Sequence, residues 1–496
     1  MIWLLCMCVG SALAVDAEPL TYRASLEAAQ QNNPTLEKTR ISEAQAESSW
    51  KGARAAFDPT LDLSGQSVTS QDRGFFSGFP FDSNSNSFGM DATVRGNTAT
   101  GTSWSLAGGM DRNLSTFVTT FGGIEDERTQ DSYGGNITAS VTQQLLKGVR
   151  MSYNLQNVTQ ARRGWEDATL RTEKARQDIL SEVARAYWAW VYAFQQQEIS
   201  EDAVVVAAEA LRVGELKVEW GELAPVEKTR LQAAHVQAKS SALEAANAAR
   251  ETRDALLLLM GRAPGAELLP ATPVGTVRDL AIDPVRAVEV AQAQNVDLIL
   301  AQRALEQAEL DEVNARHGML PNLSATVATG STSQVRFADG VGEEDSGDVP
   351  SDALTDLFAE PLPFMRVSGV LTVPLGNRAA RTEREVAAFN VQIRRAELEE
   401  VKRSIESQVR SQVAVLTSAR QRVDLADLNQ RLAEETLSAE EALSEAGRTI
   451  QKDVLEARTE VSRTRAEAVK ARTDYRMAYV ELLKLQGQVS DDASEL

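Results

Sequence analysis

The chain has very few of the residues that carry most enzyme and metal chemistry. Its 496 residues include two cysteines, Cys6 and Cys8, and two histidines, His235 and His317. The histidines lie far apart in the sequence and are not spaced as metal ligands. The sequence also has no glycine-rich phosphate loop and no serine elbow. These absences predict a protein that is not an enzyme, with no metal site and no cofactor.

Positive charge and long apolar runs are also scarce. The formal net charge is -20, which argues against a nucleic-acid partner, because a phosphate backbone attracts basic surfaces. After the first fourteen residues no run of 18 or more apolar residues occurs, so the sequence offers no transmembrane helix. Aromatic residues make up 5% of the chain, whereas Ala, Glu, Arg and Leu are abundant, as in long helices.

The first fourteen residues, MIWLLCMCVGSALA, form an apolar run with a small-residue ending. We interpret this run as a secretory signal peptide cleaved after Ala14, which leaves a mature chain without cysteine. A lipid anchor is a second interpretation, although Met7 precedes Cys8 where a small residue is needed. A buried strand or helix is a third.

The rest of the chain is an internal duplication. Three matched pairs share an offset of 262 and are Asn33 with Asn295, Pro59 with Pro321, and Leu61 with Leu323. Farther along, the offset falls to 230, where Gln144 lies opposite Pro374. The first half therefore carries a longer insert after Pro59.

This duplication predicts the organisation of the chain. We expect a signal peptide (1–14), a first repeat (15–261), a linker rich in proline and glycine (262–284), a second repeat (285–488) and a tail (489–496). Within the repeats, strands are expected at about 59–146 and 321–375, and helical hairpins at about 154–260 and 377–485.

Apolar and small polar residues alternate in the predicted strands. Apolar residues at 137, 139 and 141 oppose polar ones at 136, 138 and 140, and a similar alternation runs from Arg366 to Val373. An outer-membrane barrel strand requires one apolar and one polar face. A half-buried sheet of a soluble protein is the alternative.

Three segments in the strand regions are harder to assign. Gln71–Ser87 and Ser333–Phe364 are predicted as loops. Phe75, Phe76, Phe79 and Phe81 in the first are either interfacial aromatics or loop packing. The segment 88–110 alternates twice around a polar turn and predicts a hairpin, which either joins the barrel or extends outside it.

The helical arms carry narrow apolar stripes. In the second arm the stripe has spacings of three and four and consists of Leu398, Val401, Ile405, Val409, Val413, Leu416, Ala419 and Val423. Such narrow stripes favour a symmetric oligomer in which arms pack side by side. The aromatic cluster at 186–194, AYWAWVYAF, is either core packing or a ligand platform.

Each arm is interrupted by a glycine that is followed six positions later by an acid. The first break is GELAPVEKTRLQ, with Gly221 and Glu227, and the second is GRTIQKDVLEAR, with Gly447 and Asp453.

These two breaks, the duplicated plan, the turns QQLLKG and TVPLGN, and the openings NNPTL and NVDLI resemble the TolC family of outer-membrane efflux proteins. The resemblance implies a mainly helical homotrimer in which each chain adds about four strands to a 12-stranded barrel in the lipid of the outer membrane. A long helical tunnel then lies in the periplasm. It meets a periplasmic adaptor protein and an inner-membrane pump of the RND, ABC or MFS type.

The implied function is an exit duct for tripartite efflux or type I secretion. A secreted or surface coiled-coil structural or adhesive protein without a pore is the alternative. Membership of the family also implies roles for the residues at the two breaks. The pore constriction or gate falls on Asp453, Glu456, Glu227 and Arg448, and the adaptor contacts fall on Gly221, Leu223, Gly447, Thr449 and Ile450. The alternative for the acids is a solvated helix surface.

Two positions depart from the family pattern. Lys452 adjoins Asp453 where the family is apolar, which makes a ring of carboxylates less anionic. Gln144 replaces the proline that is usual at the first strand-to-helix turn, whereas Pro374 keeps it.

Overall fold

The computed structural model describes residues 18–76, 79–121, 124–272, 274–275, 277, 282–338, 355, 357, 359, 362–446 and 451–489. The predicted signal peptide lies outside the described residues. The chain divides into two compact units, and each takes segments from both sequence repeats. The helical unit comprises residues 1–45, 166–304 and 395–496, and the sheet unit comprises residues 46–165 and 305–394.

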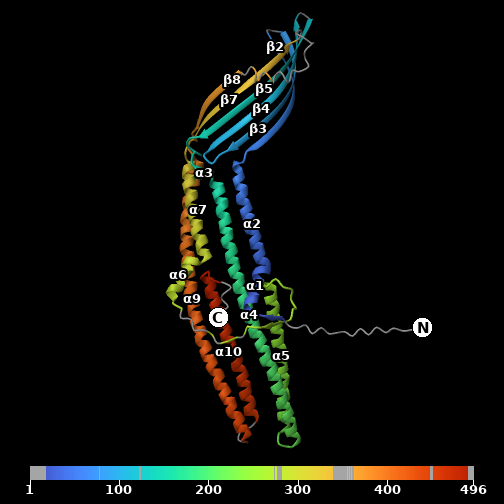
Figure 1. The fold of residues 1–496 in the computed structure, drawn as a ribbon, viewed down its shortest axis with the longest axis vertical. Helices are drawn as coiled ribbons and strands as arrows, with labels where there is room; N and C mark the ends of the chain where they lie inside the picture. The colour runs from blue at the N-terminus through green and yellow to red at the C-terminus, as the bar shows by residue number, and fades with distance from the viewer. Residues whose placement is uncertain are drawn as a thin grey trace, which may run out of the picture. The chain divides into compact units, whose positions relative to one another are not determined.

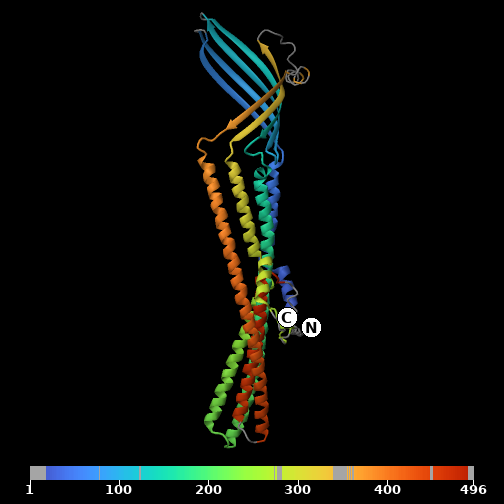
Figure 2. The ribbon, with the colours of Figure 1, turned by 90° about the vertical axis from the view of Figure 1, so that its left-hand side faces the viewer.

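The sheet unit contains a six-stranded antiparallel sheet in the order β2-β3-β4-β5-β7-β8, drawn as a curved array in Figures 1 and 2. The strands are β2 (Thr60–Phe76), β3 (Phe79–Asn97), β4 (Thr102–Phe121), β5 (Ile124–Gln144), β7 (Asn322–Ala338) and β8 (Leu362–Thr372). The first repeat supplies four strands and the second supplies two. The resemblance implied four strands in the whole chain.

The additional strands lie where the sequence predicted a hairpin of uncertain place. Residues 88–110 fall in β3 and β4, which pair along their whole shared length from Phe81–Thr119 to Asn97–Ser103. Gly101 closes the turn between them at φ +77°, a conformation that favours glycine. The predicted hairpin therefore exists, and it is part of the sheet.

The loop predictions were wrong for much of their length. Described residues of Gln71–Ser87 belong to β2 and β3, and Ser333–Ala338 belongs to β7. Polar side chains occur on both faces of this region, so the apolar alternation that reveals a strand is missing. Polar cross-strand pairs occur here instead, such as the hydrogen bond between the Ser70 and Ser85 hydroxyls at 2.7 Å.

The sheet is strongly staggered. One row of directly opposed residues runs through Thr60, Arg95, Ser105, Ser140, Ala328 and Arg366. Thr60 is the first residue of β2, but Arg366 lies six residues before Thr372, the last residue of β8. A stagger of this kind is what strands tilted in a closed barrel require.

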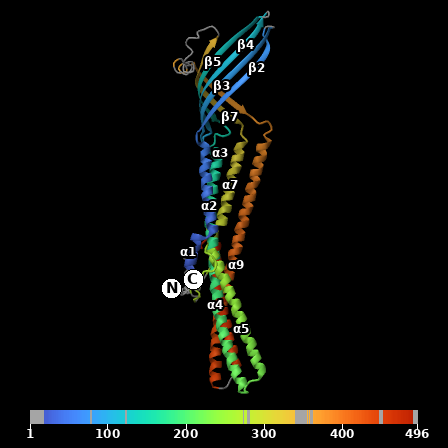
Figure 3. The ribbon, with the colours of Figure 1, turned by 90° about the vertical axis from the view of Figure 1, so that its right-hand side faces the viewer.

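Two long helical hairpins belong mainly to the helical unit. The first is formed by α4 (Gln156–Glu219) and α5 (Pro225–Leu259), and the second by α9 (Arg378–Glu445) and α10 (Gln451–Leu485). Figure 3 shows α4 and α5 side by side up to their turn. Shorter helices precede them: α1 (Tyr22–Asn32), α2 (Pro34–Arg54), α3 (Met151–Asn154), α6 (Pro284–Gln294) and α7 (Val296–Gly318). Strands β1 (Glu18–Leu20) and β6 (Leu268–Pro270) pair in parallel. No described helix is both long enough and apolar enough to cross a bilayer.

The two repeats make the same contacts where the second arm of each hairpin ends against the short helices. Asn33 ends α1, caps α2 and donates from its side chain to the Leu259 carbonyl at 2.7 Å. Asn295 ends α6, caps α7 and donates to the Leu485 carbonyl at 3.0 Å. One asparagine thus joins three helix ends in each repeat, which explains the matched pair in the sequence.

The aromatic cluster at 186–194 is core packing. Tyr187, Trp188 and Trp190 are almost fully buried, and Tyr22 stacks on Trp188 with ring centroids 5.5 Å apart. Arg476 of α10 places its guanidinium 4.2 Å from the centre of a Trp188 ring. Burial lowers the pKa of Arg476 and raises the pKa of Tyr22, and the cation–π contact partly compensates the desolvated charge.

Candidate channel wall and hairpin ends

One face of the sheet is apolar across all six strands. Directly opposed residues share a face, and the row next to the Thr60 row consists of Leu61, Val94, Leu106, Ala139, Thr329 and Met365. Val141, Val327 and Val367 form another apolar row on this face. Most of these side chains are exposed, Leu61 to 62% and Met365 to 73%. The predicted alternation is therefore confirmed, and it places apolar side chains of different strands on one surface.

The opposite face is polar. It carries the Thr60 row and is tied by cross-strand contacts: Arg95 with Asp62 at 2.9 Å, Ser105 with Ser140 at 2.7 Å, and Thr142 with Thr326 at 2.9 Å. A sheet with one apolar and one hydrated face is suited to separate lipid from water.

Aromatic side chains bound the apolar face. Trp104 lies on it near the start of β4, and Phe88 and Tyr133 flank Arg112 eight residues farther along β4. The Arg112 guanidinium lies 5.2 Å from the centre of the Tyr133 ring and bonds Asp131 at 2.7 Å. Eight residues of strand span about 27 Å. This length fits an apolar band of about 25 Å between two aromatic girdles on tilted strands.

The first hairpin end is a tight turn at Gly221. Gly221 has φ +77°, and the Glu222 and Leu223 N–H groups both donate to the Lys217 carbonyl, at 2.8 and 3.2 Å. This pattern closes α4 with a Schellman-type cap. Pro225 then occupies the first turn of α5, where its missing N–H costs nothing. The break at GELAP is thus a helix reversal, as the sequence predicted.

Side chains at this end differ in exposure. Glu227 is partly buried and accepts a hydrogen bond from Arg230 at 2.7 Å. Leu223 is also partly buried, lying near Gly214 of α4. Trp220 is 69% exposed and Val226 is 57% exposed. Sequence reasoning missed Trp220 and Val226, although an aromatic residue directly before the breaking glycine was a usable signal.

The second hairpin end is described only on its two sides. The predicted site residues Gly447, Arg448, Thr449 and Ile450 lie outside the described residues. Asp453 lies in the first turn of α10, partly buried, and Glu456 follows one turn later, exposed. Asp453 and Glu227 therefore occupy equivalent places, in the first turn of the returning helix of each hairpin. A carboxylate there interacts favourably with the positive end of the helix dipole.

Three ion pairs join the arms of the second hairpin at heptad spacing. They are Arg458 with Glu441 at 2.8 Å, Arg465 with Glu434 at 3.2 Å, and Arg472 with Asp427 at 2.8 Å. We call this set the arginine ladder. Each step moves seven residues forward along α10 and seven back along α9, which is the register of an antiparallel coiled coil. Hydrogen bonds from Gln430 and Arg465 lower the pKa of Glu434.

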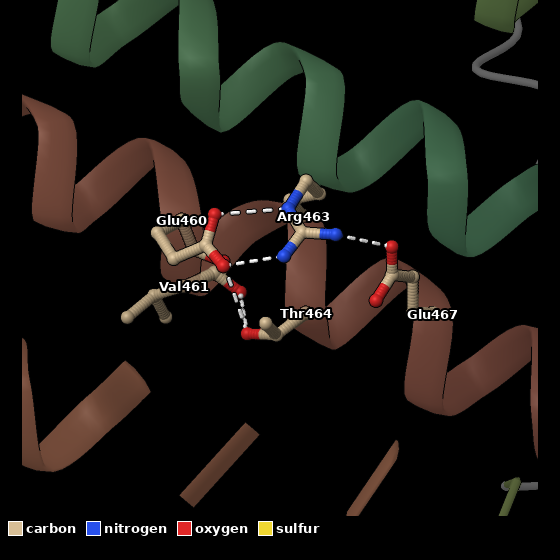
Figure 4. Close-up of polar contacts among 5 residues, drawn as sticks. All are labelled: Glu460, Val461, Arg463, Thr464 and Glu467. Carbon is tan, nitrogen blue, oxygen red and sulfur yellow. Dashed lines mark hydrogen bonds and ion pairs between the residues drawn. The ribbon is translucent and has the colours of Figure 1, made fainter. Parts of the chain in front are cut away.

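Arg463 lies on the same helix but pairs within it. Its guanidinium bridges Glu460 and Glu467, one turn away on either side (Figure 4). Its hydrogen bond lowers the pKa of Glu460. Among the described ion pairs of α10, those that reach across to α9 are thus made by arginines at the heptad positions of the ladder.

Among the described residues, no group of three or more His, Cys, Asp and Glu side chains is arranged to hold a metal ion. His235 and His317 lie on different helices, α5 and α7.

Comparison with known proteins agrees with this architecture. The sequence matches the family described as outer membrane efflux protein over residues 102–262 and 287–488. No curated protein matches the chain in sequence. Among solved structures, the fold is similar to that of the CusC channel, with a TM-score of 0.66 and 15% identity over 94% of this chain and 92% of that one. It is similar as well to the Campylobacter jejuni CmeC outer membrane channel, with a TM-score of 0.65 and 15% identity over 96% and 88% of the chains.

The open state of the Neisseria gonorrhoeae MtrE outer membrane channel is a third similar fold, with a TM-score of 0.64 and 18% identity over 94% and 88% of the chains. At such low identity these structures establish the fold, while the family match covers most of the chain. Together with the two-faced sheet and the paired helical hairpins, that match identifies the chain as a member of the outer membrane efflux protein family, an efflux protein of the outer membrane.

Proposed function

We propose that three copies of this chain form the exit duct of a tripartite efflux or type I secretion system. The two-faced sheet carries the proposal, because an apolar surface of six strands with a polar reverse side is suited to line a water-filled pore in lipid. In this proposal a periplasmic adaptor and an inner-membrane pump deliver the substrate, and the duct conducts it passively.

The gate is proposed at the ends of the hairpins. In a threefold assembly Asp453 and Glu456 of three copies approach one axis, and Glu227 forms a second acidic level. A ring of carboxylates attracts cations and binds divalent ones. Arg448 and Lys452 lie beside the acids in sequence and reduce the negative charge of the ring.

The adaptor surface is proposed at the hairpin turns. It comprises Gly221, Leu223, Gly447, Thr449 and Ile450, and we include Trp220 and Val226 because both are exposed beside the first turn. Exposed apolar side chains at a helix reversal suit a helical partner that buries them.

Planar lipid bilayers test the duct and the gate with the full-length protein. We expect stepwise ion conductance that divalent cations block. The double variant Asp453→Ala/Glu456→Ala should raise the half-blocking Mg²⁺ concentration about tenfold, which corresponds to roughly 1.4 kcal/mol of binding. Lys452→Ala should lower that concentration.

A matched control removes the same charge elsewhere. Glu399→Ala/Glu400→Ala removes two exposed carboxylates of α9 and should leave the block unchanged. Equal block in the Asp453/Glu456 variant and the parent would place those acids away from the constriction. A protein that inserts no channels would favour the structural or adhesive alternative.

A further inference from the structure

We infer that the barrel shared by three copies has 18 strands, with β8 of each copy paired to β2 of the next. The inference rests on the proposed threefold duct. It starts from the six-stranded sheet, in which β2 and β8 each pair with a neighbour on one side only among the described residues.

The two edge strands are long and exposed on both faces. Every residue of β2 whose burial is described is exposed except Gly74, and every residue of β8 is exposed except Phe364. Open sheet edges do not occur in the hydrocarbon region of a membrane, because water is absent there and each unpaired backbone group costs several kcal/mol. Both edges of this sheet therefore need a partner strand.

The chain does not provide that partner by closing on itself. Even eight strands leave an interior only wide enough for side chains to fill, so a channel of six strands is excluded. A second copy is the remaining natural partner. Strand direction alternates from β2 to β8, so β8 of one copy is antiparallel to β2 of the next and the alternation continues around the ring.

The stagger of the sheet predicts the register of this junction. We place Thr60 of one copy opposite Thr372 of its neighbour. The row of opposed residues that starts at Thr60 reaches β8 at Arg366, so the register shifts by six residues from one copy to the next. Six residues rise about 20 Å, and six strands extend about 29 Å across the sheet. The ratio gives a tilt of about 35°, which falls within the range of about 35–45° for outer-membrane barrels.

Side-chain size is complementary in this register. On the apolar face, Leu61 lies opposite Leu371, Leu63 opposite Gly369, and Gly65 opposite Val367. On the polar face, Ser64 lies opposite Ser368 and Gln66 opposite Arg366. Two of the apolar pairs set a large residue against glycine, and these two polar pairs set polar side chains against each other, whereas Asp62 lies opposite Val370 on the polar face. The apolar face therefore continues across the junction, and the polar face continues apart from Val370.

The strand number determines the width of the pore. At a tilt of about 35° each strand takes about 5.9 Å of circumference, so 18 strands give a backbone diameter of about 34 Å. Twelve strands at the same tilt give about 22 Å. The backbone diameter of this barrel is therefore roughly 1.5 times that of the 12-stranded barrel implied by the resemblance.

Disulfide cross-linking in the full-length protein tests the junction. In a background with Cys6→Ser and Cys8→Ser, the pair Leu61→Cys/Leu371→Cys should give a covalent trimer in outer membranes after oxidation. The control pair Leu61→Cys/Val94→Cys is directly opposed within one chain and should give only a cross-linked monomer. The pair Leu61→Cys/Met365→Cys lies six residues out of register and should not react.

The outcomes separate this inference from the proposed function. A native trimer that conducts ions but forms no β2–β8 link, with the intrachain control reacting, would overturn the 18-stranded barrel and leave the duct intact. A covalent dimer or tetramer would also overturn it, since the strand number would be 12 or 24. As an independent measurement, electron cryomicroscopy of the trimer along its axis should show a barrel about 34 Å across. A barrel of about 22 Å would refute the inference even if the cysteine variants fail to fold.

Discussion

The two helical hairpins are alike where they return to the short helices and different along their arms. At the return points both repeats use one asparagine and one glycine in equivalent places. Along the arms, the α9–α10 hairpin is joined by the arginine ladder, whereas described ion pairs between α4 and α5 are limited to Lys228 with Glu215 at 3.1 Å. Gly214 of α4 instead lies so close to Leu231 of α5 that an added Cβ would meet Leu231 Cδ1 at 2.3 Å. The two repeats thus share these asparagine and glycine contacts at the helix ends, which we call the joint. They differ in the contacts between the two arms of each hairpin.

The largest loss of stability is expected when the glycine of this joint is replaced in either repeat. Gly261 and Gly487 both have φ +69°, and a Cβ would lie 2.2 Å from the Asn32 carbonyl oxygen in the first and 2.7 Å from the Gln294 carbonyl oxygen in the second. Gly261→Ala and Gly487→Ala should each lower the unfolding free energy by about 3 kcal/mol or more, because strain and a backbone clash add. Thermal unfolding followed by circular dichroism at 222 nm measures this.

A matched glycine provides the control for that prediction. Gly221 has φ +77°, but no atom of the described residues lies within 4 Å of its added Cβ, so Gly221→Ala should cost only about 1 kcal/mol, from backbone strain alone. If Gly261→Ala lowered the unfolding free energy no more than Gly221→Ala, the close packing around Gly261 would not contribute to stability.

The next largest effect is expected at the shared asparagines. Asn33→Ala and Asn295→Ala should each cost about 2–3 kcal/mol, because each removes a helix cap and leaves a partly buried backbone carbonyl without its donor. The two losses should be equal within about 0.5 kcal/mol if the repeats use the joint in the same way. Asn32→Ala serves as the control, since its side chain bonds only the Ala28 carbonyl at an exposed position. A large loss of stability in one repeat alone would mean that the two asparagines have the same geometry but contribute differently to stability.

The same contrast explains how far the sequence could predict this molecule. The pairing of Asn33 with Asn295 was visible because they keep one offset, but their contacts with three helix ends were not predicted. The helix reversal at Gly221 was predicted because glycine and proline have specific backbone roles. The strands at 71–87 were missed because they carry polar residues on both faces, which removes the period-two signal. The arginine ladder was also missed. Its heptad spacing was present in the sequence, but pairing across two helices requires the register of the hairpin, which lies in tertiary structure.

The arginine ladder should show a smaller effect that distinguishes the two hairpins. Its side chains are partly exposed, Arg465 to 54% and Arg472 to 22%, and such pairs contribute about 0.2–1 kcal/mol each. Replacing all three arginines by alanine should therefore cost about 2 kcal/mol at low salt, and less at 0.5 M NaCl because salt screens the pairs. Lys228→Ala in the first hairpin should cost below about 0.5 kcal/mol. Thermal unfolding at two salt concentrations measures both, and a ladder loss that salt does not change would indicate packing rather than charge.

The smallest expected effect is a change of thermal stability with pH that comes from one histidine of the second repeat. Burial, then Arg150 and Lys147, lowers the pKa of His317, which lies edge-on to Tyr153 with ring centroids 5.3 Å apart. The folded state therefore takes up the proton less readily than the unfolded state. Stability is retained above the ordinary histidine pKa of about 6.5 and falls as the pH drops below it, until the folded form is protonated too. The melting temperature should fall by about 1–2 °C between pH 7.5 and pH 5 through this residue.

His317→Gln should remove that part of the pH dependence. The equivalent position of the first repeat, at the offset of 262, is Ala55, so no matching titration exists there. An unchanged pH profile in His317→Gln would assign the acid sensitivity to the carboxylates that the two repeats share. The difference between the repeats would then rest on the arginine ladder alone.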